Sequence, residues 1–260
     1  MKRKFTLTEE THILDQKKTL YRIKALIDFG HVKKGTLGGF VEDEENLSQD
    51  GLCWIADDAR VYGWARVSGN ALICGQAVVR RHVRVYGNAV VRDDVLLTGY
   101  VHVYDNAVVG LDSFFAEGAS ASGNAYVFCE SKRGDKRIPN VRENGTVTEN
   151  ARLLERAFIR GDAVLKGDAT LQGSAGLSGR AVADGNAILD GSARLTDEAK
   201  ALGHVLLTGR TKMFGKSAAF GRCMVSGESL ILCNAHVTGT GQYRNLKLSG
   251  DEFYRGEKTA

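Results

Sequence analysis

Residues 59–130 repeat with a period of six and read ARVYGW ARVSGN ALICGQ AVVRRH VRVYGN AVVRDD VLLTGY VHVYDN AVVGLD SFFAEG ASASGN AYVFCE. The first place of most units holds a small residue, the third holds an aliphatic one, and the fifth and sixth favour Gly, Asn and Asp. This period fits neither an α-helix, with about 3.6 residues per turn, nor the two-residue alternation of a hairpin meander. It indicates a short strand followed by a tight turn, repeated along the chain.

Three units of six residues close a triangular coil of 18 residues, so each strand is expected to pair in parallel with the strand 18 residues later. Val61, Val79, Leu97 and Phe115 then form one inner column, and the small residues occupy corners where larger side chains would collide. We therefore predict an all-β fold, a single-stranded parallel β-helix. A pentapeptide-repeat helix needs a period of about five and a propeller a period of about forty, so both are excluded.

A second run of the same form begins with GTVTEN at Gly145 and extends to residue 240. Ala125 and Ala151 lie 26 residues apart, two more than a multiple of six, so the register breaks once between the runs. The break falls in Ser131–Asn144, a polar and basic segment with the only proline, which predicts an extruded loop. The predicted organisation is an N-terminal cap (1–52), a first β-helix run (53–130), the extruded loop (131–144), a second β-helix run (145–240) and a C-terminal cap or tail (241–260).

The two ends of an open β-helix expose unpaired strand edges, which aggregate unless they are covered. Residues 1–52 mix apolar and polar positions and are predicted to form a β cap on the first coil. Gly38–Gly39 within this segment lack the following Lys-Ser/Thr of a phosphate-binding loop, so we predict that they form a structural turn.

The composition is that of a globular protein, with 43% hydrophobic and 25% charged residues. The net charge of +4 is a mild excess over 260 residues and argues against a nucleic-acid partner. Polar residues follow the basic N-terminus, and no apolar stretch is long enough to cross a membrane, so we predict a cytoplasmic protein without a signal peptide. Five cysteines without a C-x-x-C pair predict reduced thiols rather than disulfides or a zinc site.

Residues 18 apart also stack on the outside of the coil, and apolar side chains fill most of three outward columns. These columns are Arg60, Val78, Leu96 and Phe114; Leu72, Val90, Val108 and Tyr126; and Thr170, Ile188, Leu206 and Met224. Contiguous apolar stripes are rare on the surface of a monomer. They predict a homo-oligomer, most simply a homotrimer, although cover by the N-terminal arm or by the 131–144 loop would also explain them.

A different face of the first run combines basic and aromatic side chains. Its second places hold Arg66, Arg84, His102 and Ser120, and its fourth places hold Ser68, Tyr86, Tyr104 and Ser122. Arginine offers bidentate donors and tyrosine offers a flat platform, so we predict that Arg66, Arg84, Tyr86 and Tyr104 bind an anionic or planar ligand. The alternative is a solvated ladder in which like residues stack because repeats duplicate.

An N-terminal block carries a resemblance to a known family. It contains YRIKALI from Tyr21, KGTLGGFV from Lys34, NLS from Asn46 and CWIADDARVYG from Cys53 to Gly63, and it leads into G-N-A-x-V repeats. In these features the chain resembles the YdcK-like branch of the hexapeptide-repeat (LpxA-like) left-handed β-helix superfamily. The resemblance covers nearly the whole chain, and its motif is specific for the fold and weak for an activity.

The resemblance implies a left-handed coil, a trimer and a transferase that takes a coenzyme A thioester as acyl donor at a groove between subunits. It also implies a histidine as general base, and His102, on the basic and aromatic face, is the candidate catalytic residue. No histidine pair has a spacing that would bring both rings to one metal ion, so no metal site is predicted. The alternative function is a non-catalytic scaffold or binding protein with a protein partner.

Overall fold

The computed structural model describes residues 3–14, 18–128 and 138–256, which form two compact units, Met1–Gly123 and Asn124–Ala260. Apart from one short 3-10 helix, the regular elements of the described residues are all β-strands, which confirms the predicted all-β class. They contain no helix with the length and hydropathy that a membrane crossing requires.

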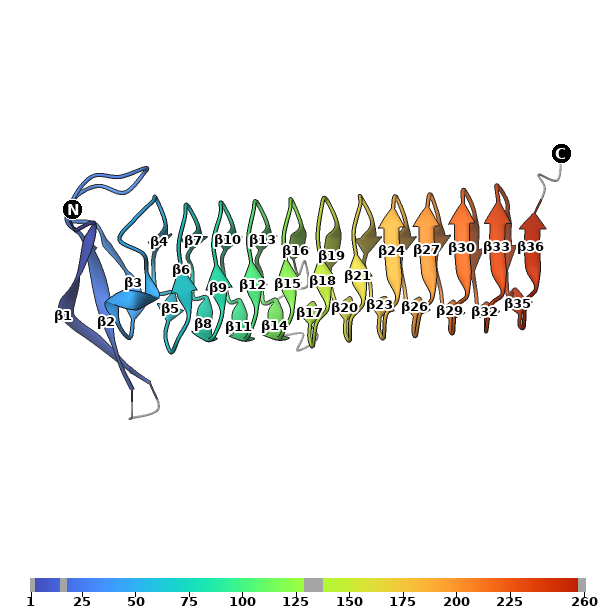
Figure 1. Ribbon diagram of the computed structural model, residues 1–260, viewed down its shortest axis with the longest axis horizontal. Coiled ribbons are helices and arrows are strands. Elements are labelled where there is room, and N and C mark those ends of the chain that lie inside the picture. Colours follow the sequence, from blue (N-terminus) through green and yellow to red (C-terminus); the bar gives the residue numbers. More distant parts are fainter. Residues whose placement is uncertain (1–2, 15–17, 129–137, 257–260) are drawn as a thin grey trace. The chain divides into compact units, whose positions relative to one another are not determined.

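The first unit opens with an antiparallel hairpin of β1 (Phe5–Leu14) and β2 (Lys18–Ala25), drawn in dark blue in Figure 1. Strand β3 (Leu37–Val41) pairs antiparallel with β2 and parallel with β5 (Arg60–Val61), so it joins the hairpin to the coil. A 3-10 helix, η1 (Glu44–Asn46), follows and is capped by the Asp43 side chain. The N-terminal segment therefore adds antiparallel strands to one sheet of the coil.

The predicted turn at Gly38–Gly39 is wrong, because both glycines lie inside β3. A Cβ on Gly39 would meet the Ala59 carbonyl oxygen and would lie 2.7 Å from the Ile55 side chain. These positions need glycine because the backbone of the cap approaches the first coil closely, and not because the chain turns there.

The coil strands of the first unit stack in three parallel sheets. After β5, the first sheet contains β8 (Val78–Arg81), β11 (Leu96–Gly99) and β14 (Phe114–Glu117). The second contains β4 (Trp54–Ile55), β7 (Leu72–Ile73), β10 (Val90–Val91) and β13 (Val108–Val109). The third contains β6 (Arg66–Val67), β9 (Arg84–Val85), β12 (His102–Val103) and β15 (Ser120–Ala121).

Within the second unit the strands are likewise stacked in three parallel rows. One contains β16 (Tyr126–Phe128), β19 (Arg152–Leu154), β22 (Thr170–Leu171), β25 (Ile188–Leu189), β28 (Leu206–Leu207), β31 (Met224–Ser226) and β34 (Gln242–Arg244). Another contains β17 (Asn140–Val141), β20 (Phe158–Ile159), β23 (Gly176–Leu177), β26 (Arg194–Leu195), β29 (Lys212–Met213), β32 (Leu230–Ile231) and β35 (Lys247–Leu248). The last contains β18 (Thr146–Val147), β21 (Val164–Leu165), β24 (Val182–Gly185), β27 (Lys200–Gly203), β30 (Ala218–Gly221), β33 (His236–Gly239) and β36 (Phe253–Gly256).

The predicted 18-residue register is confirmed in both units. Val67 pairs with Val85 in the first unit, and Leu171 pairs with Leu189 in the second. The parallel coil is therefore as expected, whereas its left hand stays a prediction.

Two boundaries of the coil differ from the sequence-based organisation. Strand β17 falls inside the predicted loop 131–144, because Val141 occupies the buried third place of a unit and pairs with Ile159. Strands β34, β35 and β36 continue the three stacks through the predicted tail 241–260. Residues 129–137, which include the first half of the predicted loop 131–144, lie outside the described residues.

The core is made of the first and third places of each unit, as the pattern predicts. Val61, Val79, Leu97 and Phe115 are fully buried, and so are the alanines at the corners, such as Ala71 and Ala89. The outward columns are also confirmed in their register, since Val78 pairs with Leu96 and Leu96 with Phe114, while Ile188 pairs with Leu206. Leu72, Val90 and Val108 are likewise neighbours, and Tyr126 belongs to the second unit.

The turn residues bind one another from coil to coil. The side-chain amide of Asn70 donates a hydrogen bond of 3.0 Å to the Asn88 Oδ1, and that of Asn88 donates one of 3.0 Å to the Asn106 Oδ1. Asp105 adopts a positive φ of 58° and accepts a hydrogen bond from the Gly123 N–H. Asn and Asp therefore recur at the turns because they tolerate this backbone and also satisfy polar groups of the next coil.

The buried cysteines are packing residues. Cys53 and Cys223 are almost completely buried and are free thiols, and burial raises the pKa of each. A raised pKa keeps the thiol protonated at neutral pH, so neither side chain has the character of a nucleophile.

Candidate functional site

The basic and aromatic face lies on the third sheet of the first unit. Arg84 of β9 is the sheet neighbour of Arg66 in β6 and of His102 in β12, and His102 is in turn the neighbour of Ser120 in β15. The structure therefore brings the predicted second-place residues into one row. The role of the row in binding or catalysis stays a prediction.

The two tyrosines of this face form a stacked pair. The rings of Tyr86 and Tyr104 are 5.0 Å apart and parallel within 5°, and the His102 ring meets Tyr86 edge-on at 6.3 Å. Partial burial, together with nearby Tyr104 and Asp105, raises the pKa of the Tyr86 phenol, against the opposite effect of Arg84. Tyr86 therefore keeps its proton and presents an O–H donor beside a flat aromatic surface.

The two arginines differ in what they contact. The Arg66 guanidinium forms an ion pair with Glu45 of η1. Arg84 is exposed, and no ion pair joins it to another described residue. Arg84 is therefore the cation of this face that is open to an anionic ligand.

His102 has a ring neighbour but no acidic partner. Its edge-on contact with Tyr86 is the interaction that the structure gives it, and neither a hydrogen bond nor an ion pair joins its ring to another described residue. General-base histidines are commonly oriented by a carboxylate or a carbonyl. Among the described residues of this face, no carboxylate or carbonyl orients the His102 ring.

Among the described residues, no group of three His, Cys, Asp or Glu side chains is placed to hold a metal ion. Three other histidines contact aromatic rings. His12 contacts Phe40, His82 lies between two aromatic rings, and His236 contacts Phe220 and Phe253.

A pocket that the sequence reasoning missed lies between the cap and the first coils. It has a volume of about 510 Å³ and is lined by Lys18, Glu42, Asp43, Glu45, Gly63, Trp64 and Arg66. Its aromatic member begins a stack of rings, Trp64, His82 and Tyr100, at the sixth place of successive coils. The 18-residue spacing of these three rings can be found in the sequence. The approach of the acidic cap residues to Trp64 cannot, because the cap does not share the repeat.

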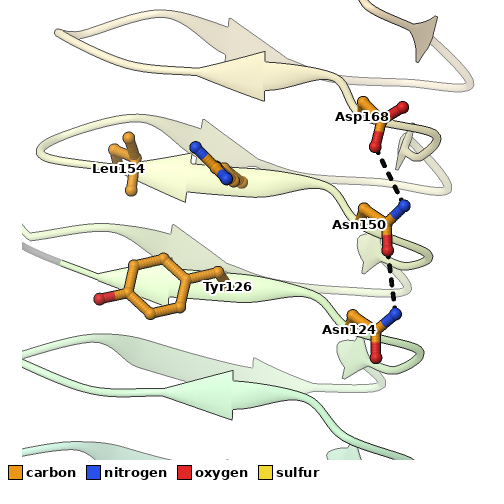
Figure 2. Close-up of a pocket in the computed structure, with 6 residues that line it drawn as sticks. Asn124, Tyr126, Asn150, Leu154 and Asp168 are labelled. Atoms are coloured by element: carbon orange, nitrogen blue, oxygen red, sulfur yellow. Dashed lines mark hydrogen bonds between the residues drawn. The ribbon is translucent and has the colours of Figure 1, made fainter.

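The second unit carries a shallow groove on the sheet that begins with β16, shown in Figure 2. It has a volume of about 620 Å³ and is lined by Asn124, Tyr126, Asn150, Arg152, Leu154 and Asp168. Asn124 donates to Asn150 and Asn150 to Asp168, at 2.9 and 3.0 Å, so the corner side chains satisfy one another (Figure 2). Tyr126 and the exposed Arg152 are the larger polar side chains of this groove that a ligand could contact.

Comparisons with known proteins give one local relative. No family model matches the chain. The uncharacterized acetyltransferase YdcK of Escherichia coli (strain K12) is 40% identical over 85 residues, a match that covers 30% of this chain and 26% of YdcK. The match therefore spans about a quarter of the length of that relative.

A solved structure of LpxA from Acinetobacter baumannii superposes with a TM-score of 0.31 at 16% identity, over 64% of this chain and 66% of that one. The stacked 18-residue coils, together with the local identity to YdcK, confirm the expected resemblance to YdcK-like hexapeptide-repeat proteins.

Proposed function

We propose that this chain is an acyl transferase of the hexapeptide-repeat type, which takes a coenzyme A thioester as donor at a groove completed by a second copy of the chain. The observation that carries the proposal is the 40% identity over 85 residues to a protein named as an acetyltransferase. The face around Arg84, Tyr86 and Tyr104 is the site that supports it best.

The chemistry of this face fits such a donor. Coenzyme A carries phosphates and a flat adenine ring, and Arg84 is an exposed cation beside the stacked rings of Tyr86 and Tyr104. A guanidinium binds phosphate oxygens through paired N–H donors, and an aromatic ring accepts a base by stacking. Arg66 lies in the same row and is a further proposed contact of the donor, with its charge partly offset by the ion pair with Glu45.

His102 is the residue proposed to handle the proton. The bound thioester supplies an acyl carbon, and the acceptor attacks that carbon through an amine or a hydroxyl. A ring nitrogen of His102 would take the proton that the acceptor loses as the new bond forms. The carbon–sulfur bond then breaks, its electron pair leaves with sulfur as the coenzyme A thiolate, and the thiolate takes up the proton from His102 to leave as free thiol. Because no described residue of the chain orients the His102 ring, we assign that role to a group of the neighbouring subunit.

A transferase of this kind is expected to bind a donor and to turn it over. Acetyl coenzyme A should raise the melting temperature, and a panel of amine and hydroxyl acceptors should release free thiol. Arg84→Ala should raise the KM for acetyl coenzyme A about tenfold through the loss of a charged contact, and His102→Ala should lower kcat about 100-fold or more. Arg210→Ala, which removes an exposed arginine of the second unit, is the matched control and should change neither. A melting temperature that no acyl thioester shifts, with no turnover, would contradict the transferase.

The second candidate function is a non-catalytic β-helical scaffold that binds a protein partner. It is favoured by one observation, the absence of a described acidic or carbonyl partner for His102. A scaffold needs only a rigid surface. For a scaffold we expect that acyl thioesters leave the melting temperature unchanged and are not turned over.

The proposal includes a cytoplasmic homotrimer, which is supported by the half-exposed apolar columns such as Val78, Leu96 and Val90. Sedimentation is expected to give three times the chain mass of 28.2 kDa. Leu96→Arg places a charge in one apolar column and should shift the protein toward the monomer while its circular dichroism stays the same. Sedimentation of the wild-type protein as a monomer at all concentrations would rule the trimer out.

A further inference from the structure

Three aromatic rings form a regular stack along one corner of the first unit. The ring centroids of Trp64 and His82 are 4.9 Å apart with planes within 5°, and those of His82 and Tyr100 are 4.6 Å apart with planes within 2°. The residues lie 18 apart, at the sixth place of three successive coils. Despite the stacking, Trp64 is 69% exposed. The exposed indole offers a large, flat apolar face to a ligand.

The ring that would continue the stack beyond Trp64 is absent. The position 18 residues earlier is Asn46, whose side chain is fully buried. Its side-chain amide donates hydrogen bonds of 2.9 Å to the carbonyl oxygens of Gly63 and Ala65, the residues on either side of Trp64. Because Asn46 turns inward, no described ring stacks on the face of Trp64 opposite His82, and Trp64 lines the pocket beside the cap.

The space on that side of Trp64 is the pocket of about 510 Å³ between the cap and the first coils. Two ion pairs line it. The Lys18 ammonium donates to both carboxylate oxygens of Glu42 at 2.7 Å, and Arg66 pairs with Glu45. Partial burial alone would raise the pKa of Glu42, but hydrogen bonds from Lys18 and from the Gly63 N–H outweigh this effect and lower it. The pocket therefore has an aromatic floor and a rim of charged donors and acceptors.

The charges of the rim exclude one large class of ligands. Glu42, Asp43 and Glu45 supply three negative charges, against two positive charges from Lys18 and Arg66. The pocket is thus formally negative by one unit, and it repels phosphate and carboxylate groups. A nucleotide or coenzyme A is for this reason a poor occupant, which separates the pocket from the face around Arg84.

We propose that this pocket binds an uncharged sugar ring, a pyranose of a saccharide, stacked on the open face of Trp64. A pyranose presents a flat apolar face of C–H groups, which suits an indole that is exposed on one side. Its edge carries hydroxyls that both donate and accept, so one hydroxyl can bind the carboxylate and the cation of a single ion pair. The occupant fills the missing place in the stack, and the inference stands independently of the proposed transferase activity.

The test uses the full chain and simple methyl pyranosides of glucose, galactose, mannose and N-acetylglucosamine as probes. Saturation-transfer NMR reports binding to every variant. In a Trp54→Phe background, the emission of Trp64, the second of the two tryptophans, reports the site itself. At least one pyranoside is expected to bind saturably and to change the Trp64 emission.

Trp64→Ala should weaken that binding by more than about tenfold. Tyr100→Ala is the matched control, because Tyr100 is similarly exposed, at 65%, and lies at the far end of the same stack. It should leave the affinity within about twofold. Glu45→Gln, which leaves Arg66 without a charged partner, should weaken binding as well. All of these side chains are exposed, so unchanged circular dichroism is expected and shows that the variants fold.

Adenosine and AMP serve as the competing probes. The proposal is overturned if adenosine binds at Trp64 and no pyranoside does, if AMP binds there more tightly than any pyranoside, or if no pyranoside binds. It is equally overturned if pyranoside binding survives Trp64→Ala unchanged.

Discussion

Leu153→Ala is expected to lower the free energy of unfolding by about 2–5 kcal/mol, whereas Leu154→Ala should cost less than about 1 kcal/mol. The two leucines are adjacent in β19, and each substitution by alanine removes the same side-chain atoms. Leu153 is fully buried in the coil, where it pairs with Val127 and Leu171 on the neighbouring strands. Leu154 lies half-exposed on the outer surface, at the edge of the shallow groove.

The cost at Leu153 comes from lost burial and from a cavity that the neighbouring coils cannot fill. The strands above and below are held in register by parallel hydrogen bonds, so the backbone has little freedom to collapse into the space. Urea unfolding followed by circular dichroism measures both variants against the wild type. Equal losses at Leu153 and Leu154 would contradict the assignment of alternate residues to core and surface.

Gly39→Val is expected to destabilise the docking of the N-terminal cap by about 3 kcal/mol or more. A side chain there would collide with the Ala59 carbonyl oxygen and with Ile55, both of which belong to the first coil. The collision would also disturb the backbone hydrogen bond from the Phe40 N–H to the Ala59 carbonyl, which is 2.8 Å long. The expected result is that residues 1–52 become sensitive to protease while the coils keep their β-structure.

Leu37→Ala is the control for Gly39→Val, because Leu37 lies in the same strand but is half exposed. It should leave the protease resistance of the cap unchanged. Limited proteolysis followed by mass spectrometry locates the first cuts. A Gly39→Val protein whose cap resists cleavage like the wild type would show that the close approach of β3 to the coil is not required.

The repeated part of the site was predictable, because a period of six with three units per coil places residues 18 apart on neighbouring strands. The row of Arg66, Arg84 and His102 and the pair of Tyr86 and Tyr104 follow from spacing alone, and the structure places them as sheet neighbours and as stacked rings. The ladder of Trp64, His82 and Tyr100 follows the same rule, and reading the sixth places in columns would have found it.

The contacts between the cap and the coils could not be predicted from the repeat, because the cap does not share it. Glu45 reaches Arg66 from η1, and Lys18 reaches Glu42 from β2, through contacts whose sequence separation follows no period. Gly38–Gly39 was misassigned to a turn for the same reason. A glycine pair fits both a turn and a close backbone approach, and only the neighbouring chain distinguishes them.

The sequence by itself determined the coil: its strand length, its 18-residue register, its alanine corners and its aliphatic core all follow from a local pattern in which each unit must bury the same two places. The tertiary structure alone decided which charges meet the repeat at its N-terminal end and how Asn46 turns inward beside Trp64. It also decided that, among the described residues, His102 has a ring contact with Tyr86 but no hydrogen-bonded or ionic partner. The physical reason is that stacking propagates a local rule from coil to coil, whereas the docking of a non-repeating segment depends on the particular shapes and charges of both surfaces.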